Sequence, residues 1–158
     1  MRFVIVAVGH RQPPWVETAV NDYIGRLPRD AVNLIELRPD PRPDNAGEQA
    51  IAKLLEREAA RIATAIPRGA AMVALDESGQ AMSTRVFATQ IERWRTDARG
   101  VAFVIGSADG LDATLKRNAD RLLSLSAMTL PHGLARVMLA EQIYRAHSLA
   151  AGHPYHRD

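Results

Sequence analysis

The length and composition of the chain fit one ordinary globular domain. Its 158 residues are 47% apolar and 24% charged, proportions that exclude extended disorder and allow a buried core. The chain contains no cysteine, which excludes disulfides, thiolate nucleophiles and the commonest zinc sites and makes a cytoplasmic location the simplest expectation. Its apolar runs stay well below the ~18 residues that a membrane span needs, so we expect a soluble protein with no membrane partner.

The charge is close to balanced but is built mainly from arginine. Twenty Lys and Arg face 18 Asp and Glu, giving a net charge of +2, and every Lys or Arg except Lys53 and Lys116 is arginine. The guanidinium group stays charged and binds phosphate through two hydrogen-bond donors, so this arginine bias suits a nucleic-acid partner. A GC-rich genome also exchanges lysine for arginine, so composition alone leaves both explanations open.

Five apolar, β-branched runs alternate along the chain with longer segments of helical periodicity. This alternation is typical of βα units around a parallel sheet and predicts a single α/β domain over residues 1–158. Pro13 and Pro14 are placed to open the first helix, and Asp112 to cap the fourth. In chain order we predict strand 3–8, helix 15–27, strand 32–37, helix 46–65, strand 71–75, helix 84–98, strand 101–105, helix 113–119, strand 122–128 and helix 134–150.

The segment from Arg38 to Gly47, RPDPRPDNAG, is the one conspicuous linker. Its three prolines disfavour both helix and sheet, so we expect a mobile surface loop. It is either a simple spacer or a place where Arg38 and Arg42 touch a phosphate backbone.

Three strand ends carry residue types that suit a ligand pocket. Leu75 and Asp76 follow the third strand, Gly106 ends the fourth in VIGSADGLD, and the fifth runs into LSLSAMTLPHG. In open α/β sheets ligands bind beyond the carboxyl ends of the strands, and an adenosine-like ligand needs close backbone approach and an apolar slot. The GxGxxG fingerprint and the Walker lysine are missing, which disfavours NAD and ATP. The residues that could form such a pocket, or could instead be simply buried strand, are Gly106, Leu125, Ser126, Met128 and Leu130.

The carboxyl-terminal region is rich in histidine. The tail HPYHRD combines two imidazoles with Tyr155 and Arg157, groups that can stack on a base, contact phosphate and move a proton. A frayed, solvated end is the alternative, and two histidines without a third ligand make a poor zinc motif. Four of the five histidines lie in the last 27 residues: His132, His147, His153 and His156.

The last predicted helix is apolar on more than one side, which suggests either a second copy of the chain or a deep core position. Glu141 and Arg145 have the spacing of an ion pair on one helix face. The apolar positions are Val137, Met138, Leu139, Ile143, Tyr144, Ala146 and Ala150.

Four motifs together resemble a known family. VAVGH, VIGSADGL, LSLSAMTLPHGLARVMLAEQIYRA and HPYHR are similar to motifs of the small SPOUT-class enzymes that methylate N3 of a pseudouridine in 23S ribosomal RNA. The resemblance covers residues 1–158. It implies a Rossmann-like parallel sheet with a carboxyl-terminal trefoil knot, S-adenosylmethionine as cofactor, a homodimer, and 23S rRNA in the large subunit or the assembled ribosome as substrate.

The resemblance also implies roles for individual residues. The tail residues would act at the incoming nucleotide, from this subunit or its partner; they are His153, Tyr155, His156 and Arg157. The cofactor would lie against Leu75, Gly106, Leu125, Ser126, Ala127, Met128, Thr129 and Leu130. One departure is that Ser107 and Ala108 follow Gly106, where members of this family often carry a second glycine.

Two other functions compete with the methyltransferase. One is a non-catalytic RNA-binding or ribosome-associated module on the same fold. The other is a metal-dependent hydrolase that uses the terminal histidines.

Overall fold

The computed structural model describes residues 3–97 and 99–156. Five parallel strands form one sheet in the order β2-β1-β4-β3-β5. Outside β3 and the end of β5, the predicted element ends agree to within two residues, and residue 98 of the predicted third helix lies outside the described residues. The elements are β1 (Phe3–Val8), α1 (Pro14–Gly25), β2 (Val32–Leu37), α2 (Glu48–Ala65), β3 (Ala71–Ala81), α3 (Thr84–Thr96), β4 (Val101–Ile105), α4 (Ala113–Asn118), β5 (Arg121–Ser124) and α5 (His132–Ala150).

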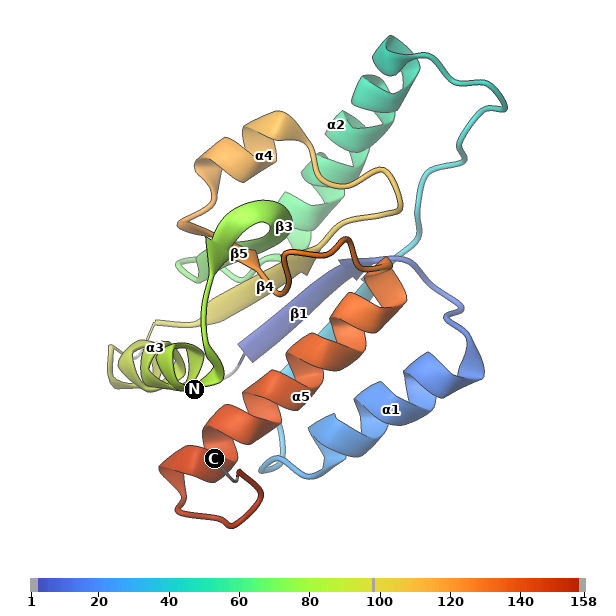
Figure 1. Cartoon of the computed structure of the whole chain (residues 1–158). Helices are drawn as coiled ribbons and strands as arrows, with labels where there is room; N and C mark the ends of the chain where they lie inside the picture. Colours follow the sequence, from blue (N-terminus) through green and yellow to red (C-terminus); the bar gives the residue numbers. More distant parts are fainter. Residues whose placement is uncertain (1–2, 98, 157–158) are drawn as a thin grey trace.

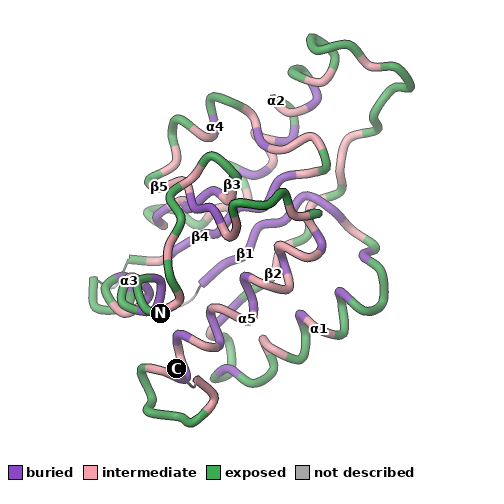
Figure 2. The backbone as a smooth tube through the Cα atoms, viewed as in Figure 1, coloured by how far each residue is buried: buried purple, intermediate pink, exposed green. Residues whose placement is uncertain are grey.

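Helices cover both faces of the sheet, as a parallel sheet requires because each crossover returns over one face. Helices α1, α3 and α5 lie on one face, and α2 and α4 lie on the other (Figure 1). The central strands β1 and β4 are consequently buried along their whole length (Figure 2). This explains why their sequences are continuous apolar runs rather than alternating ones.

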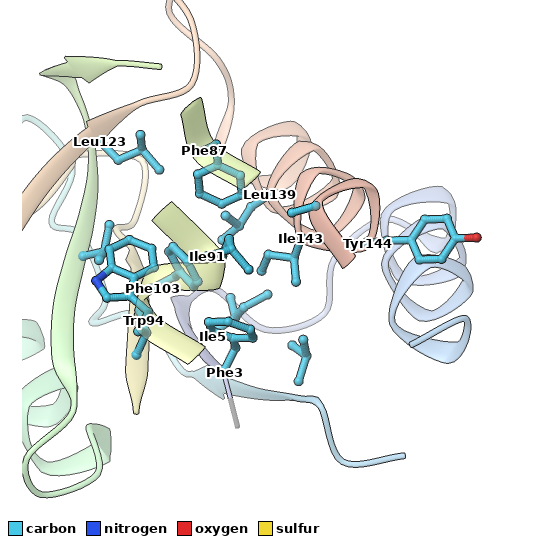
Figure 3. Close-up of a cluster of buried hydrophobic side chains, with 14 of the residues drawn as sticks. Phe3, Ile5, Phe87, Ile91, Trp94, Phe103, Leu123, Leu139, Ile143 and Tyr144 are labelled. Atoms are coloured by element: carbon cyan, nitrogen blue, oxygen red, sulfur yellow. The ribbon is translucent and has the colours of Figure 1, made fainter. Parts of the chain in front are cut away.

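The main core lies between the sheet and helices α3 and α5, and Phe103 of β4 is at its centre (Figure 3). The Phe103 ring is 6.1 Å from the rings of Phe3 and Phe87 and 5.9 Å from that of Trp94, measured between centroids. Such tilted and edge contacts each add about 0.5–1.5 kcal/mol to the burial of the rings. The cluster fixes α3 and α5 against β1 and β4.

Strand β3 is longer than predicted. The apolar run ends at Leu75, but the strand continues to Ala81 and curls around β5 (Figure 1). The register shifts on the way, so that Leu75 and Gln80 both pair with Leu123. The sequence did not reveal this continuation because residues 76–80 lie beyond the core and are mostly polar.

Strand β5 is shorter than predicted, ending at Ser124 instead of residue 128. The Ser124 hydroxyl donates to the carbonyl of Ser126 (2.8 Å), and the Ser126 hydroxyl accepts from the N–H of Met128 (2.9 Å). These local hydrogen bonds turn the chain out of the sheet. Buried strand is therefore the wrong interpretation of the stretch beyond Ser124, where Met128 is 76% exposed. The trefoil knot stays a prediction.

The apolar surface of α5 is covered largely within one chain. Leu139, Ile143 and Ala146 are at most 1% exposed in the main core, and Val137 packs beside Val16 of α1. Ala150, expected in the same stripe, is exposed. A second copy is therefore not needed to bury this helix. No helix in the described parts of the chain is long and apolar enough to cross a membrane.

Candidate active site

A cleft of about 920 Å³ opens at the carboxyl ends of β3, β4 and β5. It lies where ligands of open α/β sheets bind, because the loops that follow the strands converge there. Its wall is formed mainly by the bend of β3 (75–78), the turn after β4 (105–111) and the segment that leads from β5 into α5 (123–126 and 128–132).

The structure brings the predicted cofactor residues together in this cleft. Seven of the eight belong to its wall, and the eighth, Ala127, lies in the same loop between two of them. The seven are Leu75, Gly106, Leu125, Ser126, Met128, Thr129 and Leu130. Three segments that are far apart in the sequence thus contribute to one site.

The reason for a glycine at position 106 differs from the predicted one. We expected the missing side chain to leave room for a ligand. Instead, a Cβ on Gly106 would lie 2.4 Å from the carbonyl oxygen of Gly110, and the turn is closed by the N–H of Gly110 donating to the carbonyl of Ser107 (2.9 Å). Gly106 is therefore required by the turn itself, and any side chain there would have to displace backbone.

A charged pair forms part of the cleft wall. Lys116 Nζ lies 3.1 Å from Asp76 Oδ2, and the N–H of Ser78 donates to Asp76 Oδ1 at 3.0 Å. Burial alone would raise the pKa of Asp76, but the hydrogen bonds from Ser78 and the charge of Lys116 outweigh it and lower that pKa. Our sequence interpretation placed Asp76 at a strand end but gave no role to Lys116, which reaches the cleft from α4.

His132 lies in the cleft wall at the first position of α5, so the structure separates it from the other carboxyl-terminal histidines. Burial, together with the positive charge of Arg136, lowers the pKa of His132. Arg136 is only 2% exposed; it pairs with Glu36 and donates to the carbonyl of Gly9 at 3.0 Å. We did not assign Arg136 from the sequence, although a charged residue one turn into an apolar helix was the available signal.

The tail is at the opposite end of α5 from the cleft. The described part of the tail contacts α5 between Glu141 and Ser148, and Glu141 lies roughly 13 Å along the helix axis from His132 in the cleft wall, so residues 153–156 are set apart from the cleft of their own chain. The structure therefore does not bring His153, Tyr155 and His156 to the predicted cofactor residues of the same chain. Arg157 lies outside the described residues.

The described part of the tail folds back on α5 rather than fraying. The Tyr155 ring packs against Tyr144 with 4.7 Å between centroids, and Arg145 Cζ lies 4.7 Å above the Tyr155 ring. The Tyr155 hydroxyl donates to Glu141 Oε1 at 3.2 Å, and Glu141 also pairs with Arg145, as predicted. Burial, with further contributions from Tyr23 and Glu141, raises the pKa of Tyr155. The residue thus stays a neutral phenol.

His153 and His156 are held by the same end of the helix. The N–H of His153 donates to the carbonyl of Ser148 at 2.8 Å, and His156 Nδ1 lies 3.4 Å from Arg145 Nη1. Within residues 3–97 and 99–156, no three His, Asp or Glu side chains gather to hold a metal ion. The imidazole of His156 thus lies beside an arginine, while His153 is tied to the helix through its backbone.

Comparison with known proteins agrees with this architecture. A ribosomal RNA large subunit methyltransferase H from Bordetella pertussis is 48% identical over 99% of both chains, and one from Polynucleobacter asymbioticus is 46% identical over the full length of both. Among solved structures, a probable methyltransferase from Bordetella pertussis has a TM-score of 0.60 at 21% identity, covering 92% of this chain and 93% of that one. A probable methylase family protein from Haemophilus influenzae has a TM-score of 0.57 at 12% identity, covering 99% of this chain and 70% of that one.

The structural similarities show a shared fold, while the sequence matches show membership of a family. The family model described as predicted SPOUT methyltransferase matches residues 1–156, which is almost the whole chain. This protein belongs to the SPOUT methyltransferase family.

Proposed function

We propose that this protein transfers a methyl group from S-adenosylmethionine to N3 of a pseudouridine in 23S ribosomal RNA, acting in the cytoplasm on the large subunit or the assembled ribosome. The observation that carries the proposal is the cleft, in which the residues predicted to bind the cofactor converge from three strand ends. Relatives that match the chain from end to end are named ribosomal RNA large subunit methyltransferase H, which supports the same activity.

The size of the cleft suits this cofactor, and its wall combines apolar with polar residues. Sites for ligands of this size are typically about 300–1,000 Å³, mostly apolar, with a few polar groups. Leu75, Leu125 and Leu130 offer apolar surface for a nucleobase, while serine and threonine residues of the same wall can hydrogen-bond a ligand. The chemistry of the wall therefore fits S-adenosylmethionine, which when bound supplies a methyl group on a sulfonium centre.

The acceptor nitrogen sets a second requirement. N3 of pseudouridine carries a proton, so forming the N–CH₃ bond as the S–CH₃ bond breaks requires that this proton leave. We assign the acceptance of this proton to an imidazole of the tail, preferably that of His156, because an imidazole nitrogen is a suitable proton acceptor near neutral pH. Tyr155, kept as a neutral phenol, would stack on the base, and Arg157 would hold a neighbouring phosphate.

The position of the tail relative to the cleft supports a homodimer. Because the tail is held along the last turns of α5, roughly 13 Å or more along the helix from the cleft of the same chain, we infer that a tail that acts on the substrate serves the cleft of a second copy. Each active site would then combine the cleft of one chain with residues 153–157 of its partner.

Calorimetric titration of the purified protein with S-adenosylmethionine tests the cofactor assignment. We expect saturable binding with one site per chain, weakened when Leu125 in the cleft wall is replaced by Asp. A folded protein that binds ribosomal RNA but not S-adenosylmethionine would contradict the proposal and favour a non-catalytic RNA-binding module.

A further inference from the structure

Helix α2 has a carboxylate on its buried face, at a position where its hydrophobic periodicity predicts an apolar side chain. The buried residues of this helix are Leu54, Glu58 and Ile62, spaced four apart on one face, and Glu58 is only 2% exposed. A buried carboxylate is costly unless hydrogen bonds replace the water it has lost. Its partners therefore indicate why it is there.

Both oxygens of Glu58 accept a hydrogen bond from a loop. Oε1 accepts from the backbone N–H of Asp40 at 3.1 Å, and Oε2 accepts from the hydroxyl of Ser107 at 2.9 Å. Asp40 belongs to the proline-rich segment 38–47, whereas Ser107 follows Gly106 in the turn that forms part of the cleft wall. One buried side chain thus joins two loops that are more than sixty residues apart.

A second contact ties the same two loops. Arg42 Nη1 lies 2.8 Å from Asp109 Oδ1, and Asp109 also belongs to the cleft wall. Arg42 is half exposed, so this ion pair alone would contribute little. Beside the buried bond from Ser107 to Glu58, however, it fixes the other end of the 106–110 turn. The proline-rich segment is thus anchored at Asp40 and Arg42, although the sequence predicted a mobile loop.

We propose that Glu58 is a positioning residue for the cofactor cleft and acts through the hydroxyl of Ser107. Holding Ser107 fixes the orientation of the turn from Gly106 to Gly110, whose residues line the cleft. Glu58 itself does not touch the cofactor. The inference rests on the proposed function, because it takes S-adenosylmethionine to be the ligand of this cleft.

The test is a comparison of single-site variants by calorimetry with S-adenosylmethionine and by thermal unfolding without ligand. Replacing Glu58 would leave two loop donors unpaired, so the informative variant is Ser107→Ala, which keeps Glu58 in place. We expect Ser107→Ala to raise the Kd for S-adenosylmethionine roughly five- to tenfold, which is part of the full contribution of one hydrogen bond to a charged group. Ser107→Thr, which retains a hydroxyl, is expected to restore the Kd to within about twofold of wild type.

Ser83→Ala is the matched control for loss of stability. The Ser83 hydroxyl caps α3 by accepting from the N–H of Val86 at 3.3 Å, and Ser83 is not part of the cleft wall. This variant should unfold at a lower temperature with an unchanged Kd. An unchanged Kd in Ser107→Ala, or an equal increase in Ser83→Ala, would overturn the positioning role while leaving the proposed function intact. A wild-type protein that does not bind S-adenosylmethionine would overturn both.

Discussion

At the scale of single residues, two glycines are required by steric contacts inside the fold. A Cβ on Gly79 would lie 2.7 Å from the backbone of Leu122 and Leu123, because β3 curls around β5 at that point. A Cβ on Gly106 would collide with Gly110 in the turn beside the cleft. Neither glycine needs a positive φ, so the constraint in both cases is space rather than backbone conformation.

Gly79→Ala should therefore destabilise the protein by about 3 kcal/mol or more, because the added methyl group meets backbone that cannot move aside easily. Chemical denaturation measures the difference. Gly25→Ala is the matched control, since Gly25 is at the end of α1 and a methyl group there would meet no atom within 4 Å, so this change should stabilise slightly. Equal stability of the two variants would contradict the close crossing of β3 and β5.

The lowered pKa of His132 predicts a pH dependence of stability. The folded protein binds the His132 proton less tightly than the unfolded chain does. The residue thus contributes stability that is fully present above the ordinary histidine pKa of about 6.5 and is lost as the pH falls towards the folded-state pKa. We expect His132→Gln to reduce the loss of unfolding free energy between pH 7 and pH 5. Parallel pH profiles for His132→Gln and wild type would show that this histidine is not perturbed by folding.

At the scale of elements, hydrophobic periodicity predicted every helix and strand that the structure describes but misjudged two strand ends. Periodicity reports which residues face the core, and β3 beyond Leu75 leaves the core while still pairing with β5. The opposite error occurred after Ser124, where an apolar sequence turns out of the sheet because serine hydroxyls bond to nearby backbone. By contrast, the cap of α4 was predicted correctly, with Asp112 accepting from the N–H of Leu115 at 2.9 Å.

The tail is the element whose removal should separate binding from catalysis. Deleting residues 153–158 is expected to leave the Kd for S-adenosylmethionine nearly unchanged, because the tail is remote from the cleft of its own chain, and to abolish methyl transfer to ribosomal RNA.

His156→Ala alone should lower kcat by about 10²- to 10⁴-fold, the usual contribution of a proton acceptor. His147→Ala, in the last turn of α5 and outside the proposed site, serves as the control in the same radiolabel assay. Normal turnover by the truncated protein would mean that the tail has no catalytic role.

For the whole molecule, the sequence predicted that the candidate cofactor residues share one site, but it did not predict where the tail lies. These residues could be grouped because they follow strand ends, and strand ends of a parallel sheet meet at one edge. The distance between cleft and tail depends on the direction of α5 across the sheet, which no local pattern encodes. The link from Glu58 to Ser107 was equally hidden, since it joins residues 49 positions apart.

The proposed shared active site predicts that two inactive variants will restore activity when mixed. A Leu125→Asp chain has a damaged cleft and an intact tail, whereas a chain without residues 153–158 has an intact cleft and no tail. If the tail serves the partner, a heterodimer of the two contains one complete site, so co-refolding them should recover methyl transfer. No recovery, in samples where sedimentation shows that heterodimers form, would place the tail at the cleft of its own chain.

The activity that we propose for this chain is methylation of N3 of a pseudouridine in 23S ribosomal RNA. The most direct measurement incubates the purified protein and S-adenosylmethionine with large subunits and with assembled ribosomes that lack the modification, followed by mass spectrometry of nucleosides from the digested RNA. We expect N3-methylpseudouridine in 23S rRNA, formed in amounts that depend on S-adenosylmethionine and absent with the chain lacking residues 153–158. Methylation at another atom, or no methylated nucleoside on either substrate, would contradict it.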